Sequence, residues 1–163
     1  MSDLSDVWGT WNEWTGEQTI LFIGNGGVRR IQGTQVTILP GFASSGSSIW
    51  FDPDKYYFAA GGTVQWKRGL YNPDWGEFST GIMSSYYDDI KGTGFNDIFV
   101  VGRYLEVSHF NGVTWRNFRN EVPFSSGTFT SLAVKGNIVA AVGSVAADES
   151  GVPRYGIVMV GKR

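Results

Sequence analysis

Residues 92–115 read GTGFNDIFVVGRYLEVSHFNGVTW, and this stretch decides the fold. It contains two short runs rich in Val, Ile and Phe, Asn96–Gly102 and Glu106–Phe110, with polar and glycine residues around them. Such runs are typical of β-strands joined by tight turns. The pair Asn111-Gly112 favours a two-residue hairpin turn, since both residue types tolerate positive φ. We therefore expect an antiparallel meander here, with Trp115 at the start of its next strand.

The same plan recurs along the whole chain. An apolar run ends in glycine four times, and the four glycines are 37, 41 and 41 residues apart. A period near forty residues, with several short strands in each unit, is typical of β-propeller blades. The four runs end at Ile23-Gly24, Ala60-Gly61, Val101-Gly102 and Val142-Gly143.

These signals predict an all-β fold of propeller type in one domain, residues 1–163, with four blade repeats and no amphipathic helix. Each of the first three repeats contains four expected strands. The last contains three and lacks an outer strand, because the sequence stops soon after its third apolar run. The predicted repeats cover approximately residues 5–40, 47–80, 86–119 and 128–163.

The third repeat also carries a family resemblance. Gly92–Gly102 followed by His109-Phe-Asn-Gly-Val-Thr-Trp115 resembles a bacterial propeller repeat with the pattern Asn-Asp-Ile-Trp-Ala-Val-Gly and Asn-Gly-x-Thr-Trp. It is loosely similar to the Asp-box turn of sialidase-like propellers, of which only Asn111–Trp115 is kept. The resemblance implies a propeller fold and an extracellular or cell-surface location. It implies no activity, because one fold serves many functions.

Composition narrows the function. The net charge is −2 with no basic stripe, so we expect no nucleic-acid partner. There is no cysteine and one histidine, His109, which leaves no thiol nucleophile and no His-rich metal site. The sequence therefore predicts neither an enzyme nor a cofactor. It shows no signal peptide and no apolar run long enough to span a membrane.

Two turn-rich loops hold the candidate ligand-binding residues. Aromatic side chains beside Asn, Asp and Glu can stack on sugar rings and bond their hydroxyls, and they also form protein-binding hot spots. The alternative is that these aromatics pack at the edges of the sheets. The candidates are Trp11, Trp14, Tyr71, Asp74 and Trp75.

The three-stranded last repeat leaves the predicted ring open. The chain could be part of a larger propeller, could associate with itself or another propeller segment through open edge strands, or could close as a strained four-bladed ring. The favoured function is a binding or scaffolding module with a glycan or protein ligand. The alternatives are a lectin-like carbohydrate-binding module and a fragment of a sialidase-like glycoside hydrolase, which would need converging Arg, Tyr and carboxylate side chains.

Overall fold

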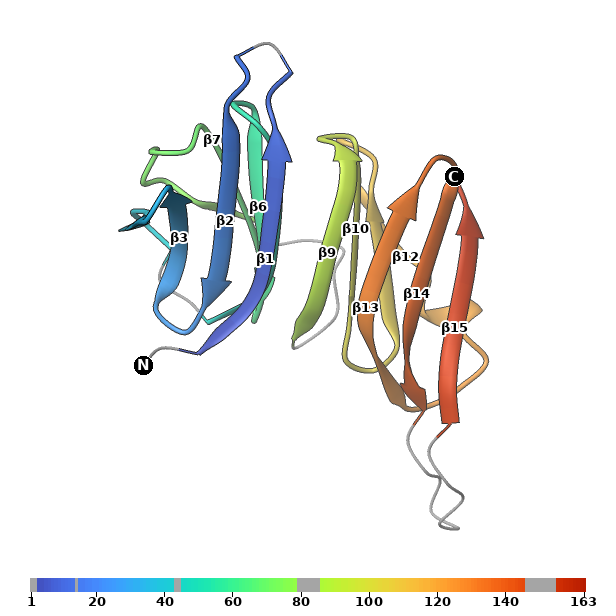
Figure 1. Cartoon of the computed structure of the whole chain (residues 1–163). Coiled ribbons are helices and arrows are strands. Elements are labelled where there is room, and N and C mark those ends of the chain that lie inside the picture. Colours follow the sequence, from blue (N-terminus) through green and yellow to red (C-terminus); the bar gives the residue numbers. More distant parts are fainter. Residues whose placement is uncertain (1–2, 14, 43–44, 79–85, 146–154) are drawn as a thin grey trace. The chain divides into compact units, whose positions relative to one another are not determined.

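A computed structural model describes residues 3–13, 15–42, 45–78, 86–145 and 155–163 (Figure 1). These residues form four antiparallel sheets and no α-helix. The chain divides into two compact units, Met1–Phe78 and Ser79–Arg163, and each unit contains two of the sheets. No helix in the described ranges is long and apolar enough to cross a membrane.

The first unit holds the first and second sheets, each a meander whose strands pair in chain order. The first sheet consists of β1 (Leu4–Trp11), β2 (Gln18–Gly24), β3 (Gly27–Gln32) and β4 (Gln35–Ile38). The second sheet consists of β5 (Gly46–Asp52), β6 (Tyr56–Gly61), β7 (Val64–Arg68) and the short β8 (Gly76–Glu77).

The second unit holds the third and fourth sheets, again with strands in chain order. The third sheet consists of β9 (Tyr87–Gly94), β10 (Asp97–Gly102), β11 (Glu106–Phe110) and β12 (Trp115–Asn117), followed by one 3-10 turn, η1 (Arg119–Glu121). The fourth sheet has three strands, β13 (Gly127–Lys135), β14 (Ile138–Val145) and β15 (Tyr155–Lys162).

The fifteen strands of the described residues coincide with the fifteen runs expected from the sequence, and the three-stranded last sheet is confirmed. One turn differs from its prediction. Phe110 pairs with Trp115, so four residues rather than two connect β11 to β12. The Asn111 side chain explains the longer loop, because its Oδ1 accepts hydrogen bonds from the backbone N–H groups of Val113 and Thr114.

The repeated glycines have a steric cause that is common to all four sheets. Each lies opposite an irregularity of the pairing, where the backbone of the sheet's first strand comes very close. A Cβ at Gly24 would overlap the carbonyl oxygen of Asp3, and one at Gly143 would overlap that of Thr128. Glycine is therefore required by close approach of the backbone, since none of the four glycines has a positive φ. The same overlap would arise at Gly61 and Gly102.

Each unit has its own apolar core between its two sheets. In the first unit, Leu21 and Ile23 of β2 are buried against Ile49 and Ala59 of the second sheet. In the second unit, Phe99 and Val101 of β10 take the places of Leu21 and Ile23, and they pack with Leu132 and Ala141 of the fourth sheet. Alternation along the strands then gives each sheet two distinct faces.

We call the side of a sheet that carries Ile23, or its counterparts Ala60, Val101 and Val142, the forward face, and the opposite side the rear face. Pairing register places these four residues one position before the four repeat glycines. In both units the forward face of the earlier sheet packs against the rear face of the later one. The two units thus repeat one packing arrangement.

An aspartate joins the two sheets in each unit. Asp6 Oδ2 accepts hydrogen bonds from Ser48 Oγ at 2.7 Å and from the Ile49 N–H at 3.1 Å. Asp89 Oδ2 bonds in the same way to Ser131 Oγ at 3.4 Å and to the Leu132 N–H at 2.8 Å. Asp6, Ser48, Asp89 and Ser131 occupy one equivalent position in the four first strands, so aspartate and serine alternate there. We call each Asp–Ser contact a clasp.

Removing an aspartate should loosen the unit that contains it. We expect Asp6→Ala to lower the free energy of unfolding by about 1.5–3 kcal/mol, because it leaves the Ile49 N–H without its charged acceptor. Denaturant unfolding of the whole chain measures the change. Asp3→Ala, at an exposed position three residues away, is the matched control and should change stability by less than about 0.5 kcal/mol. Equal effects of the two substitutions would contradict the role of the clasp.

Candidate functional site

The two aromatic loops of the first unit meet at one end of it. The loop after β1 contributes Glu17, whose Oε1 lies 2.5 Å from Arg30 Nη2. Arg30 Nη1 donates in turn to the hydroxyl of Tyr71, in the loop between β7 and β8, at 2.7 Å. Arg30 is buried and bridges the two loops, so they lie on the same side of the unit.

The structure separates the predicted site residues into different environments. Tyr71 and Asp74 are exposed, and Trp11 at the end of β1 is 59% exposed. Trp75 instead packs against the core of the first unit. Trp14 lies outside the described residues.

Trp75 is held on several sides. Its indole N–H donates to the carbonyl of Pro40 at 3.2 Å, and Phe42 meets its ring edge-on with centroids 5.1 Å apart. The ammonium of Lys67 lies 4.7 Å from the Trp75 ring centroid. These contacts and the packing on the core indicate a structural role for Trp75. They favour the alternative that the aromatic side chains of these loops pack at the edges of the sheets.

Lys67 fixes the loop that carries Trp75. Its side chain is buried, and its ammonium donates to the carbonyls of Leu70 at 2.7 Å and Asn72 at 3.0 Å. Burial lowers the pKa of Lys67 to about 8. The hydrogen bonds of this buried ammonium and its cation–π contact with Trp75 therefore hold the loop in place. Because its pKa is lowered, the Lys67 side chain begins to lose its proton at mildly basic pH.

Trp11 has a different setting, beside a polar hollow. The hollow measures about 380 Å³ and lies between the turn after β1 and the turn after β5. Asn12 Nδ2 donates to Asp54 Oδ2 at 2.9 Å across it. It is lined by Thr10, Trp11, Asn12, Glu13, Asp52, Pro53, Asp54 and Lys55. An exposed indole beside carboxylates and an amide can stack on one face of a sugar and bond its hydroxyls.

Sequence reasoning missed Asp52, Asp54 and Lys55 as members of this hollow. Pro53-Asp54 is readable as a turn between the first two strands of its repeat, and that turn lies at the same end as the loop after β1. Aligning the repeats could therefore have placed Asp52, Asp54 and Lys55 near Trp11. That step requires comparing two turns that are about forty residues apart in sequence.

The single histidine and the adjacent arginines Arg29 and Arg30 each contact neighbouring side chains. His109 stacks on Phe99 at 4.2 Å between centroids, and its Nε2 lies 3.1 Å from Asp97 Oδ1. Burial lowers the pKa of His109 below its ordinary value. Arg29 and Arg30 point to opposite faces of β3, with Arg29 over the Phe22 ring. Within the described ranges, no group of three or more His, Asp or Glu side chains is arranged to hold a metal ion.

Comparisons with known proteins give no family. No family model, curated protein or solved structure matches the chain. The functional argument therefore rests on the residues and geometry of this chain.

The different settings of Trp75 and Trp11 predict different responses to truncation. We expect Trp75→Ala to lower the free energy of unfolding by about 2–4 kcal/mol, because it opens a cavity against the core. Trp11→Ala should change it by less than about 0.5 kcal/mol, since the side chain is mainly in solvent. Chemical denaturation of both variants checks this. A stability of Trp75→Ala equal to that of the wild type would contradict the packing role.

Proposed function

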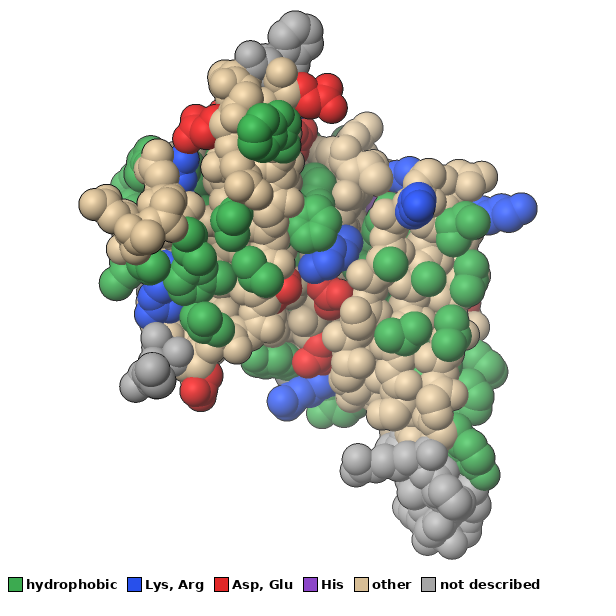
Figure 2. Space-filling view, in the orientation of Figure 1, with side chains coloured by type: hydrophobic (Ala, Val, Ile, Leu, Met, Phe, Trp, Pro, Cys, Tyr) green, Lys and Arg blue, Asp and Glu red, His purple; other side chains and the backbone are tan. Residues whose placement is uncertain are grey.

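We propose that the chain is a non-enzymatic binding or scaffolding module of propeller-type blades, one blade to each sheet, and that further sheets of the same kind complete it. The single observation that carries the proposal is a pair of uncovered apolar sheet faces. One is the rear face of the first sheet and the other is the forward face of the fourth sheet. Figure 2 shows hydrophobic side chains over β1–β3 and, separately, over β13–β15.

The rear face of the first sheet carries large apolar side chains on its outer strands. Val7 and Trp11 alternate with inward residues along β1, and Val36 and Ile38 lie on β4. These four side chains are 57 to 65% exposed. Apolar groups collected on one face of a sheet, rather than scattered singly, are typical of a surface that another protein layer covers.

The forward face of the fourth sheet is similar. Ile138 and Val142 of β14 lie beside Val158 and Val160 of β15, and all four are 43 to 66% exposed. The opposite face of the same strands packs on the third sheet. The fourth sheet therefore has one covered apolar face and one uncovered apolar face.

The two uncovered faces match the pair of faces that pack together inside each unit. Inside each unit a forward face meets a rear face, and the uncovered pair is one forward face and one rear face. The fourth sheet of one copy can thus pack on the first sheet of another copy with a forward face against a rear face, as the two sheets of each unit do. Such a head-to-tail contact is heterologous, so it makes a ring when the rotation closes.

Association should respond to charge on the uncovered face. We expect the wild-type mass in solution to exceed the 17.9 kDa of one chain, because burying both faces removes apolar surface from water. The double substitution Val158→Lys with Val160→Lys should give the single-chain mass with an unchanged melting temperature. Sedimentation or light scattering over a range of concentrations measures the mass.

The control is Val113→Lys, at a residue that is 84% exposed in the loop between β11 and β12 and lies outside both faces. It should keep the wild-type mass. A wild-type chain of single-chain mass at every concentration would contradict self-association and leave completion to sheets of another polypeptide.

A second candidate function, carbohydrate binding, is favoured by the polar hollow beside Trp11. Its indole is exposed, and the amide of Asn12 and the carboxylates of Asp52 and Asp54 lie along the same hollow. We expect Trp11→Ala to abolish retention on any glycan of an array that binds the wild type, and Tyr71→Ala, outside the hollow, to keep it. Absence of any bound glycan for the wild type would remove this candidate.

A further inference from the structure

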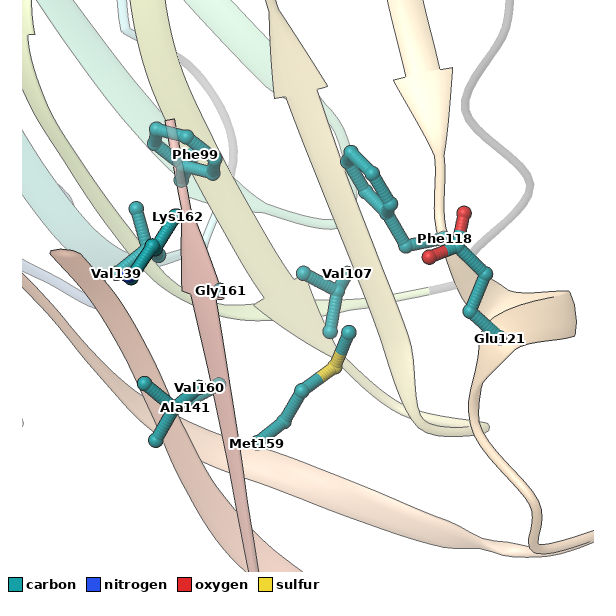
Figure 3. A pocket seen from close by; sticks show the side chains of 10 residues that line it. All are labelled: Phe99, Val107, Phe118, Glu121, Val139, Ala141, Met159, Val160, Gly161 and Lys162. Atoms are coloured by element: carbon teal, nitrogen blue, oxygen red, sulfur yellow. The ribbon is translucent and has the colours of Figure 1, made fainter. Parts of the chain in front are cut away.

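A second hollow lies in the other unit, between the third and fourth sheets near β15. It measures about 270 Å³ and is mainly apolar (Figure 3). Side chains from both sheets line it: Phe99, Val107, Phe118, Val139, Ala141 and Met159. Sites that enclose small-molecule ligands usually measure about 300–1,000 Å³, so this hollow has room for one or two side chains rather than for a whole ligand.

The first unit has a counterpart of this place. Phe118 N–H donates to the carbonyl of Val107 at 2.8 Å, just as Leu39 N–H donates to that of Val28 at 2.8 Å. The third-sheet wall of the hollow therefore corresponds to Leu21, Val28 and Leu39 of the first sheet. In the same register, the fourth-sheet wall of Val139 and Ala141 corresponds to Tyr57 and Ala59 of the second sheet.

In the first unit this place is filled. Leu70 and Trp75, from the loop between β7 and β8, pack against the cluster that contains Leu21, Val28 and Leu39. The same loop then leads into β8, which pairs with β7 as the outer strand of the second sheet. The fourth sheet has no described strand in the place of β8, and the hollow lies where the counterpart of this loop would pack.

The edge of the fourth sheet next to the hollow is also unoccupied. β15 pairs with β14 over eight residues, and its other edge pairs with no strand in the described part of the chain. Such an edge presents backbone N–H and C=O groups to an added strand. In strand addition, main-chain bonds give affinity and pockets for side chains give selectivity. Here the edge and the pocket lie together, because Met159 and Gly161 belong to both.

We propose that this edge and hollow bind an extended polypeptide segment, which pairs with β15 and inserts one aromatic side chain between Phe118 and Met159. The segment that fills the counterpart place shows the chemistry, since Trp75 there has Asp74 and Glu77 nearby in its sequence. This site does not depend on association through the two sheet faces, and it goes beyond the proposed function by naming the ligand class.

Gly161 offers a way to fill the hollow from within. It pairs with Val139 on the face that points to the third sheet, and a Cβ added there would meet no atom within 4 Å. Gly161→Phe should therefore place a ring in the hollow at little cost to folding. Gly156→Phe is the matched control, because it lies on the same strand with equally open space but points to the opposite face.

The experiment is a calorimetric titration of the whole chain with a synthetic peptide of residues 70–78, LYNPDWGEF. We expect the wild type and Gly156→Phe to bind it with equal affinity, and Gly161→Phe to bind at least tenfold more weakly with an equal or higher melting temperature. The same peptide with alanine in place of its tryptophan should also bind at least tenfold more weakly. The mass of each sample is measured in parallel, so failure of association is seen separately from failure of peptide binding.

Two outcomes would overturn the proposal. One is no heat of binding to the wild type at millimolar peptide. The other is equal binding by the wild type, Gly156→Phe and Gly161→Phe, which would place the peptide elsewhere on the chain.

Discussion

The Asp–Ser clasp is the interaction on which the arrangement of each unit depends. Apolar packing brings two sheets together without fixing how far one slides over the other, because dispersion contacts are weakly directional. A carboxylate that accepts from a serine side chain and from the backbone N–H of the next residue on the facing sheet is directional. Asp6 and Asp89 therefore set the register between sheets, and the cores of Leu21 and Phe99 form on that register.

The clasp also gives the chain a two-sheet period. Asp6 and Asp89 are 83 residues apart, as are Ser48 and Ser131, although the glycine repeat recurs at about half that distance. Sheets whose first strand carries the clasp aspartate (aspartate sheets) thus alternate with sheets whose first strand carries the clasp serine (serine sheets). The contact proposed between the fourth sheet of one copy and the first sheet of another would join a serine sheet to an aspartate sheet, and so would continue the alternation.

Much of the fold could be predicted from the sequence because strand formation here is local. Short β-branched and aromatic runs, bounded by turn residues, predicted each strand of the described part, including the three strands of the fourth sheet. The cause of the repeat glycines could not be predicted, since it is a backbone approach created by the bulges. The Asn111 loop was misjudged because a side chain, rather than backbone dihedrals, sets its length.

The candidate site was harder to predict than the strands. Trp11 and Trp75 have similar polar neighbours in sequence, yet one is exposed and the other packs on the core. What separates them is contact with distant residues, Pro40 and Phe42, which no local pattern encodes. The clasp was missed for the same reason, because it joins positions about forty residues apart and is visible only once the four first strands are aligned.

The order of the strands has a consequence for how the protein is made. Every sheet is a meander, so each new strand pairs with the one synthesised just before it. Loops that close over few residues cost little entropy and form quickly. The clasp that orders each unit joins Asp6 to Ser48 and Ile49, or Asp89 to Ser131 and Leu132, and spans only 42 or 43 residues. On the ribosome, the first unit can therefore acquire its core and its clasp while most of the second is still being translated.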